Sequence, residues 1–109
     1  MAQIERRRLK RYVERLGVQF QSGRMRGHGH IRNLCKEGVF VRAERLPEPG
    51  TQIALTLETG DGDKVEVHGT VRWTTAQLPN ARAVSPGFGV RLDECSSEYR
   101  ELFEALLLH

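Results

Sequence analysis

The chain has 109 residues, of which 39% are hydrophobic and 28% are charged. This length is enough for one domain with a modest core and too short for two, and no apolar run approaches the roughly 20 residues that a membrane-spanning helix needs. The charged start, Met-Ala-Gln-Ile-Glu-Arg-Arg-Arg, is unlike a signal peptide, so we expect a cytoplasmic protein. In a reducing compartment, Cys35 and Cys95 are expected to remain free thiols.

The net charge of +3 conceals a strong asymmetry along the chain. Residues 1–45 contain 12 Lys or Arg and 4 Asp or Glu, which gives +8, whereas residues 46–109 contain 5 and 10, which gives −5. A basic N-terminal half favours an anionic partner through electrostatic steering and charge-assisted hydrogen bonds. The charge does not identify the anion.

Residues 1–16 are predicted to form a basic arm that contains the run Arg6-Arg7-Arg8-Leu9-Lys10-Arg11. Its apolar residues follow only a ragged helical period, so we expect the arm to be partly helical or irregular. Two interpretations of the arginines are open at this point. They are either a solvated tail or planar charged donors that suit phosphates and the edge of guanine.

Six β-strands are predicted after the arm, because apolar and polar residues alternate between turn residues. The strands span about residues 18–22, 27–34, 39–43, 51–58, 65–73 and 87–92. In the fifth strand, Trp73 is in phase with three valines, so its side chain is expected to pack in the core rather than to stack on a base. Residues 76–86 carry two prolines and little periodicity, which predicts a loop.

A C-terminal helix is predicted from about Ser97 to Leu107, with a serine at its start and glutamates in its first turns. An apolar stripe at helical spacing is expected to be buried and contains Tyr99, Leu102, Phe103 and Leu106. Six strands at hairpin spacing and one helix describe a mainly β protein. We therefore expect a single-domain six-stranded antiparallel β-barrel with an N-terminal basic arm and a C-terminal α-helix.

Between the second and third strands lies the stretch Asn33-Leu34-Cys35-Lys36-Glu37-Gly38. Asn33 and Cys35 are two residues apart, so their side chains are expected on one face of a strand end, and Gly38 allows close approach of a ligand or a turn. At this stretch and at Arg7-x-x-x-Arg11 the sequence resembles the PilZ domain family, whose signatures are Arg-x-x-x-Arg and (Asp/Asn)-x-Ser-x-x-Gly. The segments 69–73 and 87–92 and the C-terminal helix resemble later parts of the same family.

The resemblance implies a binding site for the bacterial second messenger cyclic di-GMP. Carried over to this sequence, Arg7 and Arg11 would clamp phosphate and guanine, with Arg8 beside them, and Asn33 would contact a guanine edge. Gly38 would keep the backbone close to the ligand. Cys35 occupies the serine position, and a thiol is a weaker donor than a hydroxyl. The domains implied are the arm at 1–16 and a PilZ-like barrel with its helix at 17–109.

Two functions follow from this resemblance as expectations. The first is a non-enzymatic module that binds cyclic di-GMP and signals its level to a protein partner in motility, biofilm formation or surface behaviour. The second is a degenerate PilZ domain that does not bind cyclic di-GMP and acts as a protein interaction adaptor, since fold alone does not fix function. Both exclude a cofactor, a metal and membrane insertion, and the oligomeric state is left open.

Other kinds of site receive weaker support from the sequence. His28 and His30 share a strand face and could bind a metal with Cys35 or His68, but their spacing fits no closed zinc motif. A nucleophilic pair of Cys35 with a histidine lacks an orienting acid in a recognisable frame. An RNA-binding barrel would need more aromatic side chains for base stacking than a content of 6% supplies.

Overall fold

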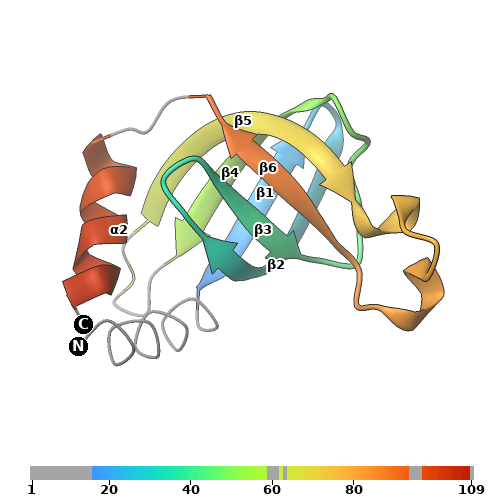
Figure 1. Ribbon diagram of the computed structural model, residues 1–109. Helices are drawn as coiled ribbons and strands as arrows, with labels where there is room; N and C mark the ends of the chain where they lie inside the picture. The colour runs from blue at the N-terminus through green and yellow to red at the C-terminus, as the bar shows by residue number, and fades with distance from the viewer. Residues whose placement is uncertain (1–15, 59–61, 63, 94–96, 109) are drawn as a thin grey trace.

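A computed structural model describes residues 16–58, 62, 64–93 and 97–108, and shows six strands and a C-terminal helix in these ranges (Figure 1). The strands are β1 (Gly17–Ser22), β2 (Met25–Leu34), β3 (Gly38–Arg42), β4 (Gln52–Glu58), β5 (Lys64–Thr74) and β6 (Gly87–Leu92). The predictions for Arg7, Arg8, Arg11 and Cys95 concern positions outside the described residues. In the described ranges, no helix is both long and apolar enough to cross a membrane.

The strands close into an antiparallel barrel in the order β1-β2-β3-β6-β5-β4, so the predicted barrel is confirmed. Glycines with a positive φ lie in the connections between strands. Gly23 (φ +60°) turns β1 into β2, and Gly50 (φ +89°) leads into β4 after the two prolines. Closure leaves the barrel with no unpaired strand edge, so a partner can dock only on its side chains or loops.

Alternation along the strands fills the interior with aliphatic side chains and two phenylalanines. Phe20 and Phe88 pack edge to face, with their ring centroids 5.0 Å apart. The fully buried side chains include Ile31, Val41, Leu55, Leu57 and Val71. The interior is therefore a packed core rather than a ligand cavity, and a binding site has to lie on the outer face of the barrel.

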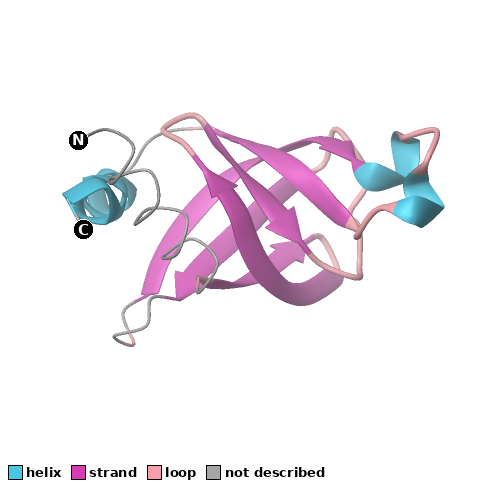
Figure 2. Ribbon diagram, turned by 60° about the horizontal axis from the view of Figure 1, so that its bottom comes forward, coloured by secondary structure: helices cyan, strands magenta, loops and turns pink. Residues whose placement is uncertain are grey.

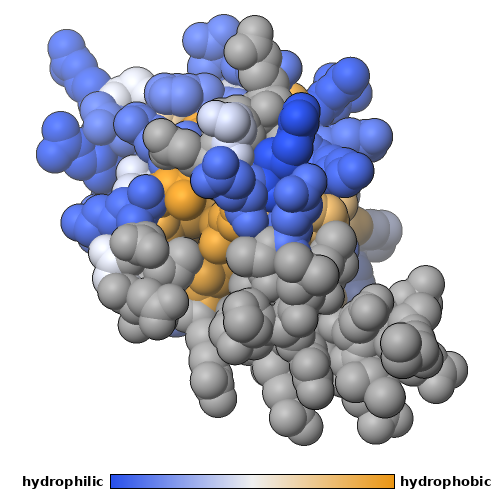
Figure 3. Space-filling model, turned by 90° about the vertical axis from the view of Figure 1, so that its left-hand side faces the viewer, coloured by the Kyte–Doolittle hydropathy of each residue, from blue (hydrophilic) through white to orange (hydrophobic). Residues whose placement is uncertain are grey.

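Helix α2 (Ser97–Leu108) lies at one end of the barrel, and two short 3-10 turns, η1 (Thr75–Gln77) and η2 (Ala81–Ala83), lie at the other end (Figure 2). Hydrophobic residues gather in the middle of the α2 end, with hydrophilic residues above and beside them in the view of Figure 3. Of the predicted apolar stripe, Tyr99 is fully buried, whereas Leu102 and Phe103 are only partly buried against the core. The side chain of Leu106 is outside the described part of the chain.

The predicted loop at 76–86 is partly wrong, because η1 and η2 occupy much of it. Each is a single turn. The side chain of Gln77 accepts a hydrogen bond from the backbone N–H of Thr74 at 2.9 Å, which fixes the end of β5. Buried Thr75 similarly accepts one from the backbone N–H of Gly87 at 3.1 Å, which fixes the start of β6. The second bond holds η1, which directly follows β5, against the start of β6 at the end of the barrel away from α2.

Candidate functional site

The turn between β2 and β3 carries the predicted motif and is held by hydrogen bonds to its neighbours. The carbonyl of Gly38 accepts the Cys35 N–H at 3.0 Å and the Cys35 thiol at 3.3 Å. The N–H of Leu92 in β6 donates to the carbonyl of Glu37 at 2.8 Å. Tyr99 in α2 donates its hydroxyl to the carbonyl of Cys35. The motif turn is thus tied to both β6 and the C-terminal helix.

Two β-bulges shape the outer face beside this turn. In β2, Ile31 pairs with Val41 and Asn33 with Phe40, so Arg32 is an extra residue. In β5, Val71 pairs with Val90 and Trp73 with Gly89, which makes Arg72 the extra residue. A bulge turns two consecutive side chains to the same side of a sheet. Arg32 and Asn33 are accordingly both exposed, as are Arg72 and Trp73.

The second bulge corrects the prediction for Trp73. The side chain was expected in the core because Trp73 is in phase with the valines of its strand. The extra residue Arg72 reverses the phase, so Trp73 faces outward with 40% of its surface exposed, and Thr74 takes the next inward position at 3%. Trp73 is available to a ligand.

An aromatic platform, formed by Phe40 and Trp73, lies across the outer face. Their ring centroids are 5.2 Å apart and the rings are inclined by 28°, which is a stacked arrangement. Room for the rings comes from two glycines of β6. A Cβ at Gly89 would lie 2.5 Å from the indole nitrogen of Trp73, and a Cβ at Gly87 would lie 2.6 Å from the Phe40 ring. The platform requires these two positions to carry no side chain.

The platform and the motif turn border one surface hollow of about 550 Å³, which we call the motif hollow. Register explains the convergence, since Asn33, Phe40, Gly89 and Trp73 occupy one row across four neighbouring strands. The residues that line the hollow are Asn33, Cys35, Glu37, Gly38, Val39, Phe40, Arg72, Trp73, Gly89, Val90 and Arg91. Chemically, it offers an amide, a thiol, two guanidinium groups and a flat apolar surface, against one carboxylate.

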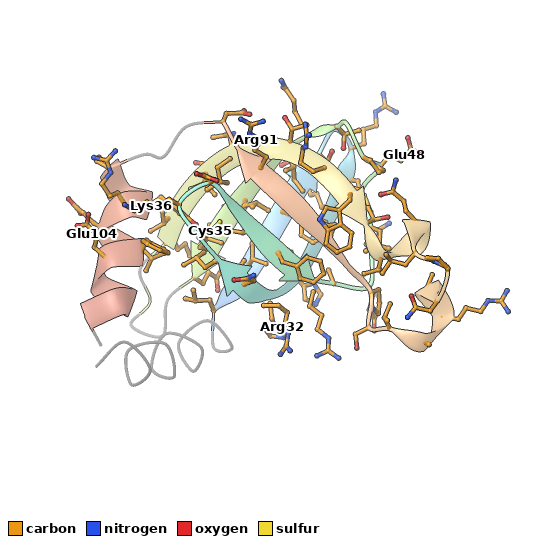
Figure 4. All side chains as sticks on the ribbon, in the orientation of Figure 1. Arg32, Cys35, Lys36, Glu48, Arg91 and Glu104 are labelled. Carbon is orange, nitrogen blue, oxygen red and sulfur yellow. The ribbon has the colours of Figure 1, made fainter. Side chains whose placement is uncertain are left out.

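Of the predicted site residues, the structure brings Asn33, Cys35 and Gly38 to this hollow. Figure 4 shows Cys35 and Lys36 at the end of the β2–β3 turn that faces α2, and Arg91 near the end of β6. Arg32 points away from the barrel in the same view, and it does not line the hollow. Cys35 is exposed and is a free thiol, as expected.

Gly38 has a structural role that the sequence did not indicate. A Cβ at this position would lie 2.5 Å from the backbone carbonyl oxygen of Val90 in β6. Backbone cannot move aside as a flexible side chain can, so only glycine lets β3 and β6 approach this closely. The residue therefore contributes to the barrel itself, whatever it contributes to a ligand.

Sequence reasoning missed Phe40, Arg72 and Arg91 as lining residues and placed Trp73 in the core. One signal could have found the platform: the Gly87-Phe88-Gly89 segment puts two glycines on one face of β6. Glycine in a strand interior marks close approach by another group, here the two aromatic rings. The bulges themselves have no comparable mark in the sequence.

The alternative sites gain no support from the geometry. His28 and His30 are exposed on β2. Among the residues that the structure describes, no group of three His, Cys, Asp or Glu side chains could hold a metal ion. His68 lies 3.6 Å from Glu66 on β5, and both side chains are well exposed.

The fold and the motif hollow together define a small closed β-barrel with a terminal helix and a mixed aromatic and cationic surface site. Comparison of the sequence with protein families gives a match to the PilZ domain over residues 5–109. The chain therefore belongs to the PilZ domain family. A comparison with curated proteins found no match.

Two of the solved structures that resemble this fold have 14% and 15% sequence identity to the chain. One is the Borreliella burgdorferi PlzA protein in complex with c-di-GMP, with a TM-score of 0.64 and 14% sequence identity over 98% of this chain and 38% of that one. The other is the Bacillus subtilis inhibitor of motility, MotI/DgrA, with a TM-score of 0.62 and 15% identity over 85% of this chain and 46% of that one. The chain thus spans less than half of either protein, and the likeness concerns the fold.

Proposed function

We propose that this chain is a non-enzymatic module that binds cyclic di-GMP and passes its level to a protein partner. The observation that carries the proposal is the convergence of Asn33, Cys35 and Gly38 with an exposed aromatic platform in one hollow. Membership of the PilZ family supports it, as does a similar fold that was solved with c-di-GMP bound.

In this proposal each group in the hollow meets a matching part of the ligand. A guanine base stacks on Trp73, since aromatic rings accept any flat base. The Asn33 amide hydrogen-bonds to a guanine edge. Arg72 and Arg91 offer guanidinium donors to phosphate. Arg7, Arg8 and Arg11 of the arm would supply further cationic donors to the ligand.

The test is a titration with cyclic di-GMP, followed by calorimetry and by tryptophan fluorescence. Because Trp73 is the single tryptophan of the chain, its emission reports the hollow alone. We expect binding accompanied by a change in emission. Arg11→Ala should weaken binding by about 2 kcal/mol, the cost of losing a charge-assisted bidentate contact. The matched control, Arg82→Ala, removes an exposed arginine of η2 outside the hollow and should leave the affinity unchanged.

The second candidate is a PilZ domain that has lost the ligand and acts as an adaptor. The presence of Cys35 at the serine position favours it, and the MotI name shows that one protein of this fold acts as an inhibitor of motility. Silent calorimetry at high concentrations of cyclic di-GMP, for wild type and for Cys35→Ser alike, would select this candidate. Loss of affinity in Arg82→Ala equal to that in Arg11→Ala would also count against a specific site.

A further inference from the structure

A second hollow, of about 600 Å³, lies on the outer face at the opposite end of β3 from the motif turn. We call it the basic hollow and define it by Arg26, His28, His30, Arg42 and Arg45, with Glu44 as its only carboxylate among the described lining residues. It is separate from the motif hollow, with which it shares no lining residue. Phe40 lines the motif hollow, and its ring lies over Gly87. Gly87 pairs with Arg42, which lines the basic hollow, so the Phe40 ring lies between the two hollows.

The positive charge in the basic hollow exceeds the negative charge that the described residues bring to it. In the described part of the chain, no carboxylate forms an ion pair with Arg26, Arg42 or Arg45. The net charge of the three arginines and Glu44 is +2, before any proton on the two histidines. Unpaired guanidinium groups that share a concave surface raise the local positive potential and attract an anion.

Two of the arginines are fixed in place while most of their donors stay free. Arg42 donates one N–H to the Ser85 hydroxyl at 2.5 Å, and Arg45 donates one to the backbone carbonyl of Arg26 at 2.9 Å. A guanidinium group carries five N–H donors, so each retains several for a ligand. Because the side chains are already ordered, less conformational entropy is lost when they bind.

The walls of the hollow are also rigid. The N–H of Ala43 donates to the carbonyl of Pro86 at 3.1 Å, which joins the end of β3 to the segment before β6. A Cβ at Gly29 would lie 2.1 Å from the carbonyl oxygen of Arg42, so β2 and β3 are in direct backbone contact here. The arrangement is a built recess rather than a set of arginines on separate mobile loops.

We propose that the basic hollow docks an acidic segment of a protein partner. Its cationic groups come from β2, from the end of β3 and from the residues after β3, so they suit several carboxylates along an extended chain better than a single small anion. Guanidinium groups bind carboxylates in a bidentate manner. The described lining contains no Phe, Tyr or Trp ring for a nucleobase to stack on, in contrast to the motif hollow.

The experiment measures fluorescence anisotropy of a fluorescein-labelled octapeptide of alternating glutamate and alanine, titrated with the full chain at low salt. The double variant Arg42→Gln/Arg45→Gln should weaken binding at least fivefold. The control Lys64→Gln/Arg100→Gln removes the same charge from exposed positions on β5 and α2 and should change binding by less than twofold. Glu44→Gln, which removes the carboxylate, should tighten binding. Circular dichroism confirms that each variant is folded.

Four results would overturn the proposal. These are no binding of the octapeptide at low salt, equal weakening by the two double variants, no tightening by Glu44→Gln, and stronger competition by an octathymidylate of the same charge sign than by unlabelled peptide. A fifth result would come from sedimentation of the protein alone, which measures its oligomeric state. A dimer that Arg42→Gln/Arg45→Gln abolishes would assign the hollow to a second copy of this chain instead. None of these measurements uses cyclic di-GMP. A negative result would therefore contradict the docking of an acidic segment without contradicting the binding of cyclic di-GMP.

Discussion

Cys35 is the residue at which this chain departs from the PilZ motif, and the structure shows what its thiol does. The thiol lies 3.3 Å from the carbonyl of Gly38, and the backbone carbonyl of Cys35 accepts the hydroxyl of Tyr99. The side chain is exposed, and its thiol hydrogen-bonds back across the motif turn. Its position favours a polar contact with the turn or a ligand, and sulfur makes such a contact weakly.

Cys35→Ser should tighten the binding of cyclic di-GMP by about fivefold, which corresponds to about 1 kcal/mol for one improved neutral hydrogen bond. Calorimetry of wild type and variant measures the difference. Cys35→Ala is the control, because it removes the polar atom without supplying a hydroxyl and should bind no better than wild type. Equal affinities for the serine and alanine variants would mean that this side chain does not contact the ligand.

At the level of single residues, the sequence predicted most buried side chains of the strands correctly, but it placed the exposed side chain of Trp73 in the core. Alternation placed Val65, Val67 and Val71 in the core, where they lie. It failed at Trp73 because a bulge shifts the phase of alternation by one residue. The extra residue of the bulge is Arg72, and nothing about an arginine in a strand indicates a bulge. The motif residues Asn33 and Cys35 were placed on one face correctly, whereas the platform beside them depends on pairing between distant strands.

At the level of elements, β3 is the strand that joins the motif turn to the rest of the barrel. Its first residue, Gly38, faces the carbonyl of Val90 in β6, and the neighbouring Glu37 accepts the N–H of Leu92. Tyr99 links the same turn to α2. Strand boundaries were predicted to within one or two residues from alternation and turn residues, but contacts between elements that are far apart in the sequence could not be.

Gly38→Ala should lower the free energy of unfolding by about 1–3 kcal/mol, because its Cβ would overlap a backbone oxygen and force β3 and β6 apart. Urea denaturation followed by circular dichroism measures this change. Gly17→Ala is the matched control, since a Cβ at Gly17 has no heavy atom within 4 Å in the described structure and its φ is not positive. That variant should keep the stability of wild type. A stable Gly38→Ala protein would show that the strands adjust to the methyl group.

At the level of the whole molecule, charge is divided between the two halves of the sequence, and three described arginines of the positive half lie on two neighbouring strands. Arg26, Arg32 and Arg42 all lie exposed on β2 and β3, the two strands that also carry the motif turn. These three arginines are not part of the motif, but their charges add to the positive electrostatic potential around the two hollows. The sequence predicted an anionic partner from this asymmetry. It could not show that two arginines of the acidic half, Arg72 and Arg91, line the motif hollow, while arginines of the basic half line the other.

This distribution predicts that charge acts mainly on the rate at which cyclic di-GMP arrives. Long-range attraction between a basic face and a dianionic ligand raises the association rate and is screened by salt, since the Debye length falls from about 10 Å at 0.1 M to about 3 Å at 1 M. Stopped-flow measurement of Trp73 emission gives both rate constants. Raising the salt concentration from about 50 mM to about 500 mM should lower the association rate constant on the order of tenfold and change the dissociation rate constant much less. Arg42→Gln, outside the motif hollow, should reduce the salt dependence of association without changing dissociation. A salt effect confined to the dissociation rate would instead mean that charge acts through short-range contacts made only in the complex.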